Sequence, residues 1–266
     1  MGLPRGLLSA LMLFVLDTGP ALAATPEVGR AEGTTVTVFA AASLRDVFAA
    51  LGSTFEREHP GTKVQFNFAG SQELKTQLEH GAPADVFASA DLKHMDAVRM
   101  AGLIDAPKRF ATNSPVIVVP ADNPAKVASL EDLATVKRLV IGTPEVPIGM
   151  YTLQILDKAK AQFGPDFPAR VQARVVSREL NVRQVLTKVT LGEADAGIVY
   201  RTDARSAAGK VRVVEIPAEL NVLAEYPIAT VARAPHATLA RAWVALVTGP
   251  IGQAALEDGG FGRVSK

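Results

Sequence analysis

The sequence predicts an α/β protein built as two lobes with a cleft between them. Apolar residues alternate between a spacing of two and a spacing of about 3.6 along the chain, as they do where strands alternate with helices. Two such series follow one another, and strand-like segments rather than flexible linkers join them. We therefore expect a first lobe at 34–114 plus 229–266 and a second lobe at 115–228. A single large doubly wound sheet is compatible with the same alternation.

The first residues predict export. An apolar run, Gly6–Leu16, follows one basic residue, and Ala21-Leu22-Ala23 supplies the small-x-small pattern that signal peptidase recognises. The run is too short for a transmembrane helix, which needs about 20 apolar residues. We expect residues 1–23 to be a cleaved signal peptide and the mature protein to be periplasmic.

The first series contains three expected strands, at 35–40, 64–68 and 85–90, where apolar residues are continuous or alternate with polar ones. A helix is expected over 44–55, because its apolar residues recur three and four positions apart. A second helix is expected over 72–80, and Asp91 is placed to cap a third.

The second series is longer and ends in two helices. Strands are expected where apolar runs are bounded by Pro, Gly or charged residues: 115–119, 139–142, 174–176, 196–200, 211–216 and 226–231. Helical spacing predicts helices over 149–163, 182–191, 239–247 and 251–257.

Composition narrows the function. The chain has no cysteine, which excludes disulfides, thiolate metal ligands and a lipid-modified cysteine after the signal. The 28 basic and 27 acidic residues leave a net charge of +1 and form no basic block, so neither nucleic acid nor an anionic membrane surface is an expected partner. Hydrophobic residues make up 48% of the chain, enough for one large core or two smaller ones.

Several junctions between a strand and the next helix have the residues of an anion site. Ser43, with Asp46 in a capping box, Ser71 and Asn181 are expected at helix N-caps, and 144–149 leads into another helix. The free N–H groups and positive dipole end of a helix attract anions, and hydroxyls rotate to meet an oxygen. If these junctions converge, neutral donors could enclose a small oxyanion. Taken singly, each junction is more often ordinary capping than a ligand site.

Five motifs occur in an order that resembles a known family, the periplasmic molybdate-binding proteins of ABC importers, which are type II binding proteins. The motifs are TVFAAASL (37–44), GAPADVFASAD (81–91), PEVPIGMY (144–151), NVRQVL (181–186) and GIVYRTDA (197–204). The likeness runs from about residue 35 to residue 261.

The resemblance implies two lobes, each a mixed sheet flanked by helices, that close over molybdate or tungstate. It implies five ligand-binding residues: Ser43 through its hydroxyl and its backbone N–H, Ser71 and Tyr200 through their hydroxyls, and Ile148 and Val182 through their backbone N–H groups. It further implies no cofactor, a monomer, and one partner, the inner-membrane permease of the importer. The larger size of molybdate would favour it over sulfate in a rigid shell of donors.

This chain departs from the family pattern at two places. Gly70 stands where some relatives have another serine, and the segment before Ile148 is one residue shorter than in some members, which affects its register. Two cations, Arg45 and Arg183, lie within the motifs, and we expect both to face solvent because they follow the starts of their helices.

Two other functions are weighed against molybdate binding. The same scaffold could bind sulfate, phosphate or an organic anion, although protonated phosphate would need an acceptor that the five residues do not provide. A serine-dependent hydrolase would use Ser43 or Ser71 as nucleophile. That reading has no G-x-S-x-G elbow to support it, and the four histidines lie at expected turns or solvated faces.

Overall fold

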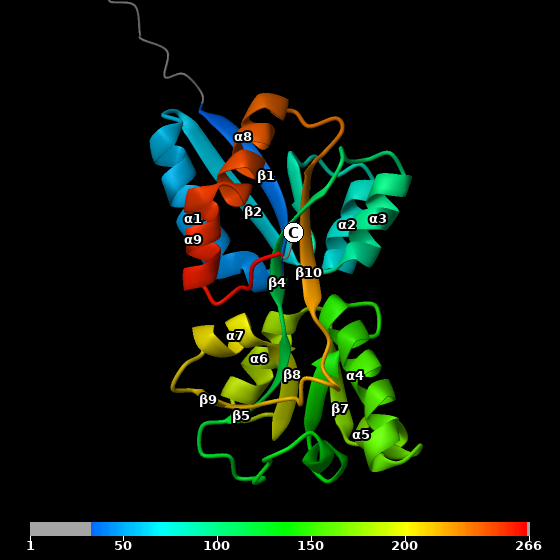
Figure 1. The fold of residues 1–266 in the computed structure, drawn as a ribbon. Helices are drawn as coiled ribbons and strands as arrows, with labels where there is room; N and C mark the ends of the chain where they lie inside the picture. The colour runs from blue at the N-terminus through cyan, green and yellow to red at the C-terminus, as the bar shows by residue number, and fades with distance from the viewer. Residues whose placement is uncertain (1–32, 265–266) are drawn as a thin grey trace, which may run out of the picture. The chain divides into compact units, whose positions relative to one another are not determined.

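The computed structural model describes residues 33–264, and the predicted signal peptide lies outside the described residues. Two five-stranded mixed sheets form its framework (Figure 1). The first sheet has the order β2 (Thr62–Ala69), β1 (Thr34–Ala41), β3 (Val86–Ala88), β10 (Ala224–Thr230), β4 (Lys108–Asn113). The second has the order β7 (Val175–Glu179), β6 (Leu139–Gly142), β8 (Ala196–Tyr200), β5 (Pro115–Pro120), β9 (Val211–Val214).

Both sheets follow the same plan. Three strands in each are parallel, β2, β1 and β3 in the first and β7, β6 and β8 in the second. A strand that pairs antiparallel to them, β10 or β5, then continues the sheet. Parallel strands need crossover connections, and helices supply these here. The carboxyl ends of three parallel strands are thereby available in each lobe.

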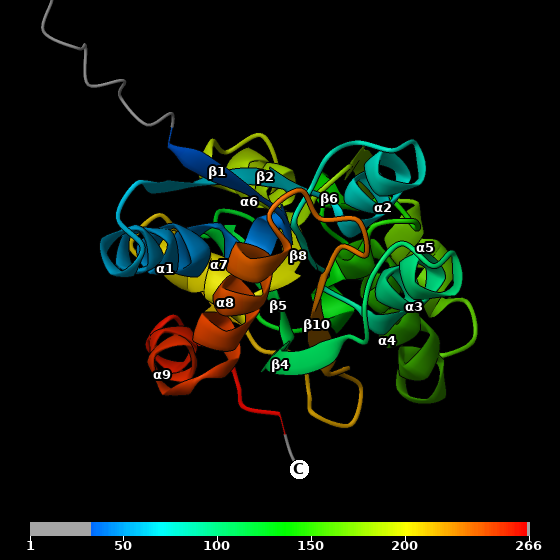
Figure 2. The ribbon, with the colours of Figure 1, turned by 90° about the horizontal axis from the view of Figure 1, so that it is seen from above.

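Helices cover both faces of each sheet. The first sheet is flanked by α1 (Arg45–Glu58), α2 (Ser71–Glu79), α3 (Leu92–Met100), α8 (Ala237–Thr248) and α9 (Pro250–Asp258). Figure 2 shows α1, α8 and α9 together on one side of it, with α2 and α3 on the other. The second sheet is flanked by α4 (Pro147–Phe163), α5 (Phe167–Gln172), α6 (Val182–Thr190) and α7 (Arg201–Ser206). Two short 3₁₀ turns complete the set, η1 (Ala42–Leu44) and η2 (Glu131–Ala134).

The chain crosses between the sheets twice. Ser114 alone separates β4 of the first sheet from β5 of the second, and the chain returns from β9 to β10 through residues 215–223. Strand β10 of the first sheet begins at Ala224, before the predicted boundary at 229. The exact division of the chain into lobes at 115 and 229 stays a prediction. Because these two crossings are the covalent links between the sheets, a change in the angle between the lobes has to be absorbed there.

Aromatic side chains anchor the core under α1 and α8. The indole of Trp243 is fully buried and meets Phe48 and Phe55 edge to face, with ring centroids 5.5 Å apart in each pair. A smaller apolar cluster, which includes Leu74, Phe87 and Met95, fills the other face of the first sheet under α2 and α3. Both faces of the sheet are thus covered, which fixes the strand ends that border the site.

Most expected elements are confirmed, two of them, 139–142 and 196–200, at their predicted bounds. The strand expected at 85–90 is shorter, because only Val86–Ala88 pairs with its neighbours. One strand and two α-helices were not expected, β4, α5 and α7, and neither were the two 3₁₀ turns. Within residues 33–264, no helix has both the length and the apolar character needed to cross a membrane.

Candidate functional site

A cavity lies where the parallel strands of both sheets end. Its lining comes from segments at or after the carboxyl ends of β1, β2, β3, β6, β7 and β8, the edge at which ligands of such sheets bind. All five residues identified from the sequence line it: Ser43, Ser71, Ile148, Val182 and Tyr200. The other lining residues are Ala41, Ala42, Ala69, Gly70, Ala90, Val146, Pro147 and Asn181.

The lining is neutral and the cavity is small. Among its residues, only Tyr200 has an ionisable side chain. The cavity volume is about 10 Å³, close to the least that holds one water molecule. In this arrangement of the lobes the cavity is too small for a sugar or an amino acid.

The two serines bond to partners that the sequence did not indicate. Neither is an N-cap, because Ala41 and Gly70 occupy those positions, so this expectation was wrong. The Ser43 hydroxyl lies 2.9 Å from the hydroxyl of Tyr226, not beside an N–H of its own helix. The Ser71 hydroxyl oxygen accepts a hydrogen bond of 3.0 Å from the backbone N–H of Ala90. Both side chains are buried at the cavity wall.

Helix starts supply backbone donors to the same wall. Ser71, Ile148 and Val182 are the first or second residues of α2, α4 and α6, where an N–H has no partner within its own helix. Within residues 33–264, no hydrogen bond is formed by these three N–H groups. The predicted N-cap Asn181 is confirmed: its side-chain oxygen accepts from the next two N–H groups after Val182. Capping therefore leaves the Val182 N–H free.

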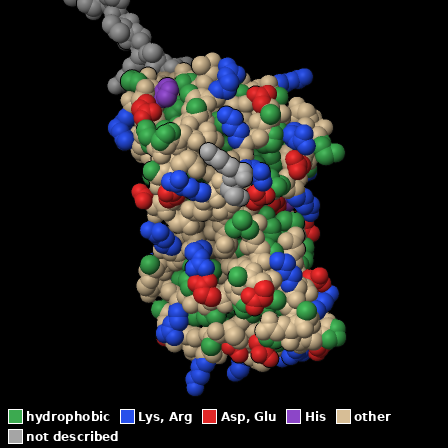
Figure 3. Space-filling model, viewed as in Figure 1, with side chains coloured by type: hydrophobic (Ala, Val, Ile, Leu, Met, Phe, Trp, Pro, Cys, Tyr) green, Lys and Arg blue, Asp and Glu red, His purple; other side chains and the backbone are tan. Residues whose placement is uncertain are grey.

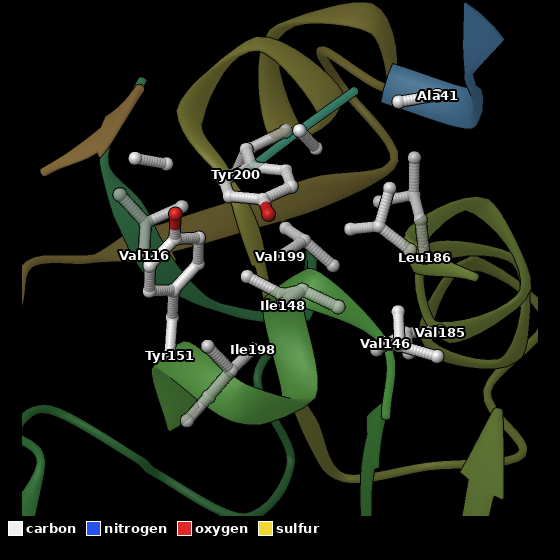
Figure 4. Close-up of a cluster of buried hydrophobic side chains, with 14 of the residues drawn as sticks. Ala41, Val116, Val146, Ile148, Tyr151, Val185, Leu186, Ile198, Val199 and Tyr200 are labelled. Atoms are coloured by element: carbon white, nitrogen blue, oxygen red, sulfur yellow. The ribbon is translucent and has the colours of Figure 1, made fainter. Parts of the chain in front are cut away.

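Tyr200 offers a phenol without a partner. Its side chain is 1% exposed, and within the described part of the chain its hydroxyl forms no hydrogen bond. Figure 4 shows this hydroxyl turned toward Ile148, which also lines the cavity. Burial raises the pKa of Tyr200 well above its ordinary value, so the phenol keeps its proton. A buried donor with no acceptor costs free energy, unless a guest supplies the acceptor.

Arg183 does not face solvent, and that expectation was wrong. Its Nη2 donates to Asp46 on α1 at 2.7 Å, and its Nε lies 2.7 Å from a carboxylate oxygen of Asp203 on α7. Burial raises the pKa of Asp203 to about 6, although Arg183 lowers it. Because α1 flanks the first sheet and α6 the second, the Arg183–Asp46 pair ties the two lobes together.

Arg45 is exposed as expected, with its guanidinium 4.8 Å from the ring centre of Phe68.

The lobes also meet at Gly70. The side-chain amide of Gln72 donates a hydrogen bond of 2.8 Å to the carbonyl oxygen of Leu180, which precedes α6. A Cβ atom on Gly70 would lie 2.4 Å from that same oxygen, closer than real Cβ contacts. The absence of a side chain at Gly70 thus permits the close approach of the two lobes beside the cavity.

Three residues of the site region were missed from the sequence: Tyr226, Leu180 and Asp203. Tyr226 occurs in an apolar strand pattern, where a core role is the ordinary reading. Leu180 acts through its carbonyl oxygen, which every residue has. Asp203 belongs to the GIVYRTDA motif, so its place next to Tyr200 was the one signal available.

The hydrogen bonds of the serines involve no histidine. Ser43 pairs with Tyr226 and Ser71 with Ala90, whereas His94 bonds to Asp91 and His236 to Asp85. Activation of a serine nucleophile would require a base within hydrogen-bonding reach.

Within residues 33–264, no group of three or more His, Asp or Glu side chains is placed to hold a metal ion. On the face drawn in Figure 3, basic and acidic side chains are interspersed.

Residues 36–262 match the family model of bacterial extracellular solute-binding proteins. The chain is 42% identical over 267 residues to the molybdate-binding protein ModA of Mycobacterium tuberculosis, an alignment that covers 99% of this chain and 98% of that protein.

Two solved structures share the fold. The periplasmic molybdate-binding protein of Azotobacter vinelandii has a TM-score of 0.75 and 21% identity, over 86% of this chain and 100% of that one. The sulfate-binding protein SubI of Mycobacterium tuberculosis has a TM-score of 0.77 and 22% identity, over 87% and 88% of the two chains. The two-lobed α/β fold expected from the sequence is confirmed.

Proposed function

Because the chain belongs to the family of bacterial extracellular solute-binding proteins and is 42% identical to a molybdate-binding protein, we propose that it binds molybdate, and tungstate as well. The ligand is the intact oxyanion, held through its oxygen atoms. The binding residues are Ser43, Ser71, Ile148, Val182 and Tyr200. The name of the relative at 42% identity supports this choice of ligand.

The observation that supports the proposal best is a small, neutral cavity with unused donors. The Tyr200 hydroxyl and the N–H groups of Ser71, Ile148 and Val182 have no partner within residues 33–264. A tetrahedral oxyanion has only acceptors, so it can satisfy all of these donors at once. Such donors favour an anion even without a counter-charge, because the helix termini present partial positive charge.

Binding and lobe closure are coupled in this mechanism. Ser43 and Ser71 follow strands of the first sheet, whereas Ile148, Val182 and Tyr200 follow or end strands of the second. Only a closed arrangement gathers both groups around one anion. A ligand shifts an open–closed equilibrium by its differential affinity for the two states, so the anion favours closure. The closed protein then docks on the permease of an ABC importer in the periplasm, where opening releases the anion.

The decisive experiment is a titration of the purified protein with four anions, followed by calorimetry and thermal unfolding. We expect molybdate and tungstate to bind, with each tenfold excess over Kd adding about 1.4 kcal/mol to the free energy of unfolding. Sulfate should bind more weakly, because a shell set for a larger anion leaves long hydrogen bonds to a smaller one. Phosphate should fail, because its proton finds no carboxylate in the lining. Tight binding of sulfate alone would replace the proposed ligand.

Affinity should vary little with pH. The neutral Tyr200 phenol donates below its pKa and would lose its proton only as pH rises through that raised pKa. We therefore expect the Kd for molybdate to change less than about twofold between pH 7 and 9. Calorimetry in buffers of matched ionic strength measures this directly. A tenfold loss across that interval would mean that an ordinary titrating group contacts the anion.

A further inference from the structure

Tyr226 lies behind the cavity wall and touches two of its donors. Its side chain is fully buried on β10, one of the strands that follow a crossing, and it is not itself part of the lining. Its hydroxyl lies 2.9 Å from the hydroxyl of Ser43. Its ring meets the ring of Tyr200 edge to face, with centroids 5.9 Å apart.

The chemistry of an anion decides which hydroxyl donates. Ser43 has a single hydroxyl proton, and a proton given to Tyr226 could not also be given to a guest. An oxyanion only accepts, so Ser43 contributes a bond to it only by donating. The Ser43 oxygen is then free to accept from Tyr226. Burial raises the pKa of Tyr226 well above its ordinary value, so this phenol retains the proton that it has to donate.

Ser71 is held in the same way by a different group. Its oxygen accepts a hydrogen bond from the backbone N–H of Ala90. A peptide N–H only donates, so it cannot accept the Ser71 proton in return. The Ser71 proton is therefore available for the cavity. The two serines on the first lobe thus each have a donor behind them, a peptide N–H for Ser71 and a phenol for Ser43.

We propose that Tyr226 is a positioning residue for anion binding, which donates to the Ser43 oxygen and turns the Ser43 proton toward the guest. This inference rests on the proposed function. The resulting sequence of bonds, from Tyr226 to Ser43 to the anion, runs in one direction, and each bond in such a series strengthens the next. Tyr226 shapes the site without touching the ligand.

The test is Tyr226→Phe, which removes the hydroxyl and keeps the ring. We expect the Kd for molybdate, measured by calorimetry, to rise about 2- to 12-fold, as for the loss of one neutral hydrogen bond. The matched control is Tyr151→Phe. Tyr151 is also buried and packs edge to face on Tyr200, but it has no contact with Ser43 and does not line the cavity. Its Kd should stay within about twofold of the unchanged protein.

Testing Tyr226→Phe in a protein that already carries Ser43→Ala distinguishes an effect through Ser43 from a general effect on the structure. If Tyr226 acts through Ser43, then Tyr226→Phe should not weaken binding further in a protein that already has Ser43→Ala. Equal losses in both backgrounds would overturn the inference, as would an unchanged Kd in Tyr226→Phe alone. Thermal unfolding of each empty variant verifies that it is folded. Absence of molybdate binding by the unchanged protein would instead overturn the proposed function, and this inference with it.

Discussion

Gly70→Ala is expected to weaken molybdate binding strongly while the empty protein stays fully folded. The added Cβ would lie 2.4 Å from the Leu180 carbonyl oxygen, a main-chain atom of the other lobe that cannot move aside alone. Overpacking of this kind costs about 1–3 kcal/mol, which corresponds to a Kd about 5- to 150-fold higher. Gly70 has φ −66° and ψ 144°, a conformation that alanine adopts readily. The overlap therefore arises on closure and not on folding.

A variant at Gln72 distinguishes the two possible causes of this effect. The same Cβ would also approach the Gln72 side chain, at 2.4 and 2.5 Å, but that side chain is flexible. Gly70→Ala combined with Gln72→Ala should still bind poorly, because the Leu180 oxygen remains. Calorimetry gives the Kd values, and thermal unfolding of the empty proteins should show no loss of stability. Full recovery of binding in the double variant would assign the overlap to Gln72 instead of to the meeting of the lobes.

Tyr200→Phe is expected to weaken molybdate binding without destabilising the empty protein. A hydrogen bond to a charged group contributes about 1.5–3 kcal/mol, so the Kd for molybdate should rise about 10- to 150-fold. The empty protein should be no less stable, because within residues 33–264 no protein group bonds to the phenol. The ring keeps its edge-to-face contacts with Tyr151 and Tyr226.

Two measurements on Tyr200→Phe test this pair of effects: calorimetry with molybdate, and denaturant unfolding of the empty protein. Tyr151→Phe again serves as the control for loss of a buried hydroxyl in the same cluster. Should Tyr200→Phe bind as tightly as the unchanged protein, its hydroxyl would not belong to the shell around the anion. A fall in the free energy of unfolding would show that the phenol has a stabilising partner in the empty state.

The sequence predicted the parts of the site that depend on local order. Strands 139–142 and 196–200 were found because continuous buried apolar runs end at polar or loop residues. The five residues predicted to bind the ligand lie at or after strand ends, and such ends meet at one edge of a parallel sheet. Asn181 was found as an N-cap because its side chain bonds only two and three residues onward.

Local sequence patterns could not predict contacts between segments that lie far apart in the chain. The partner of Ser43 is Tyr226, 183 residues later, and Arg183 pairs with Asp46 at a separation of 137 residues. Helical position alone placed Arg183 on an exposed face, because nothing local indicated two carboxylates from other helices. Strand β4 was missed because its first two residues, Lys108 and Arg109, are exposed and charged.

Because the cavity lining is uncharged, a bound anion changes the net charge of the whole molecule. No side chain of the cavity neutralises a doubly negative guest, so its charge adds to that of the protein. The chain has a formal net charge of +1 at pH 7. Occupied protein would therefore stand at −1, the sum of +1 and −2, and migrate toward the opposite electrode from empty protein. Ion-exchange chromatography or native electrophoresis should resolve loaded from vacant molecules, and a membrane partner could tell them apart by the same reversal of sign.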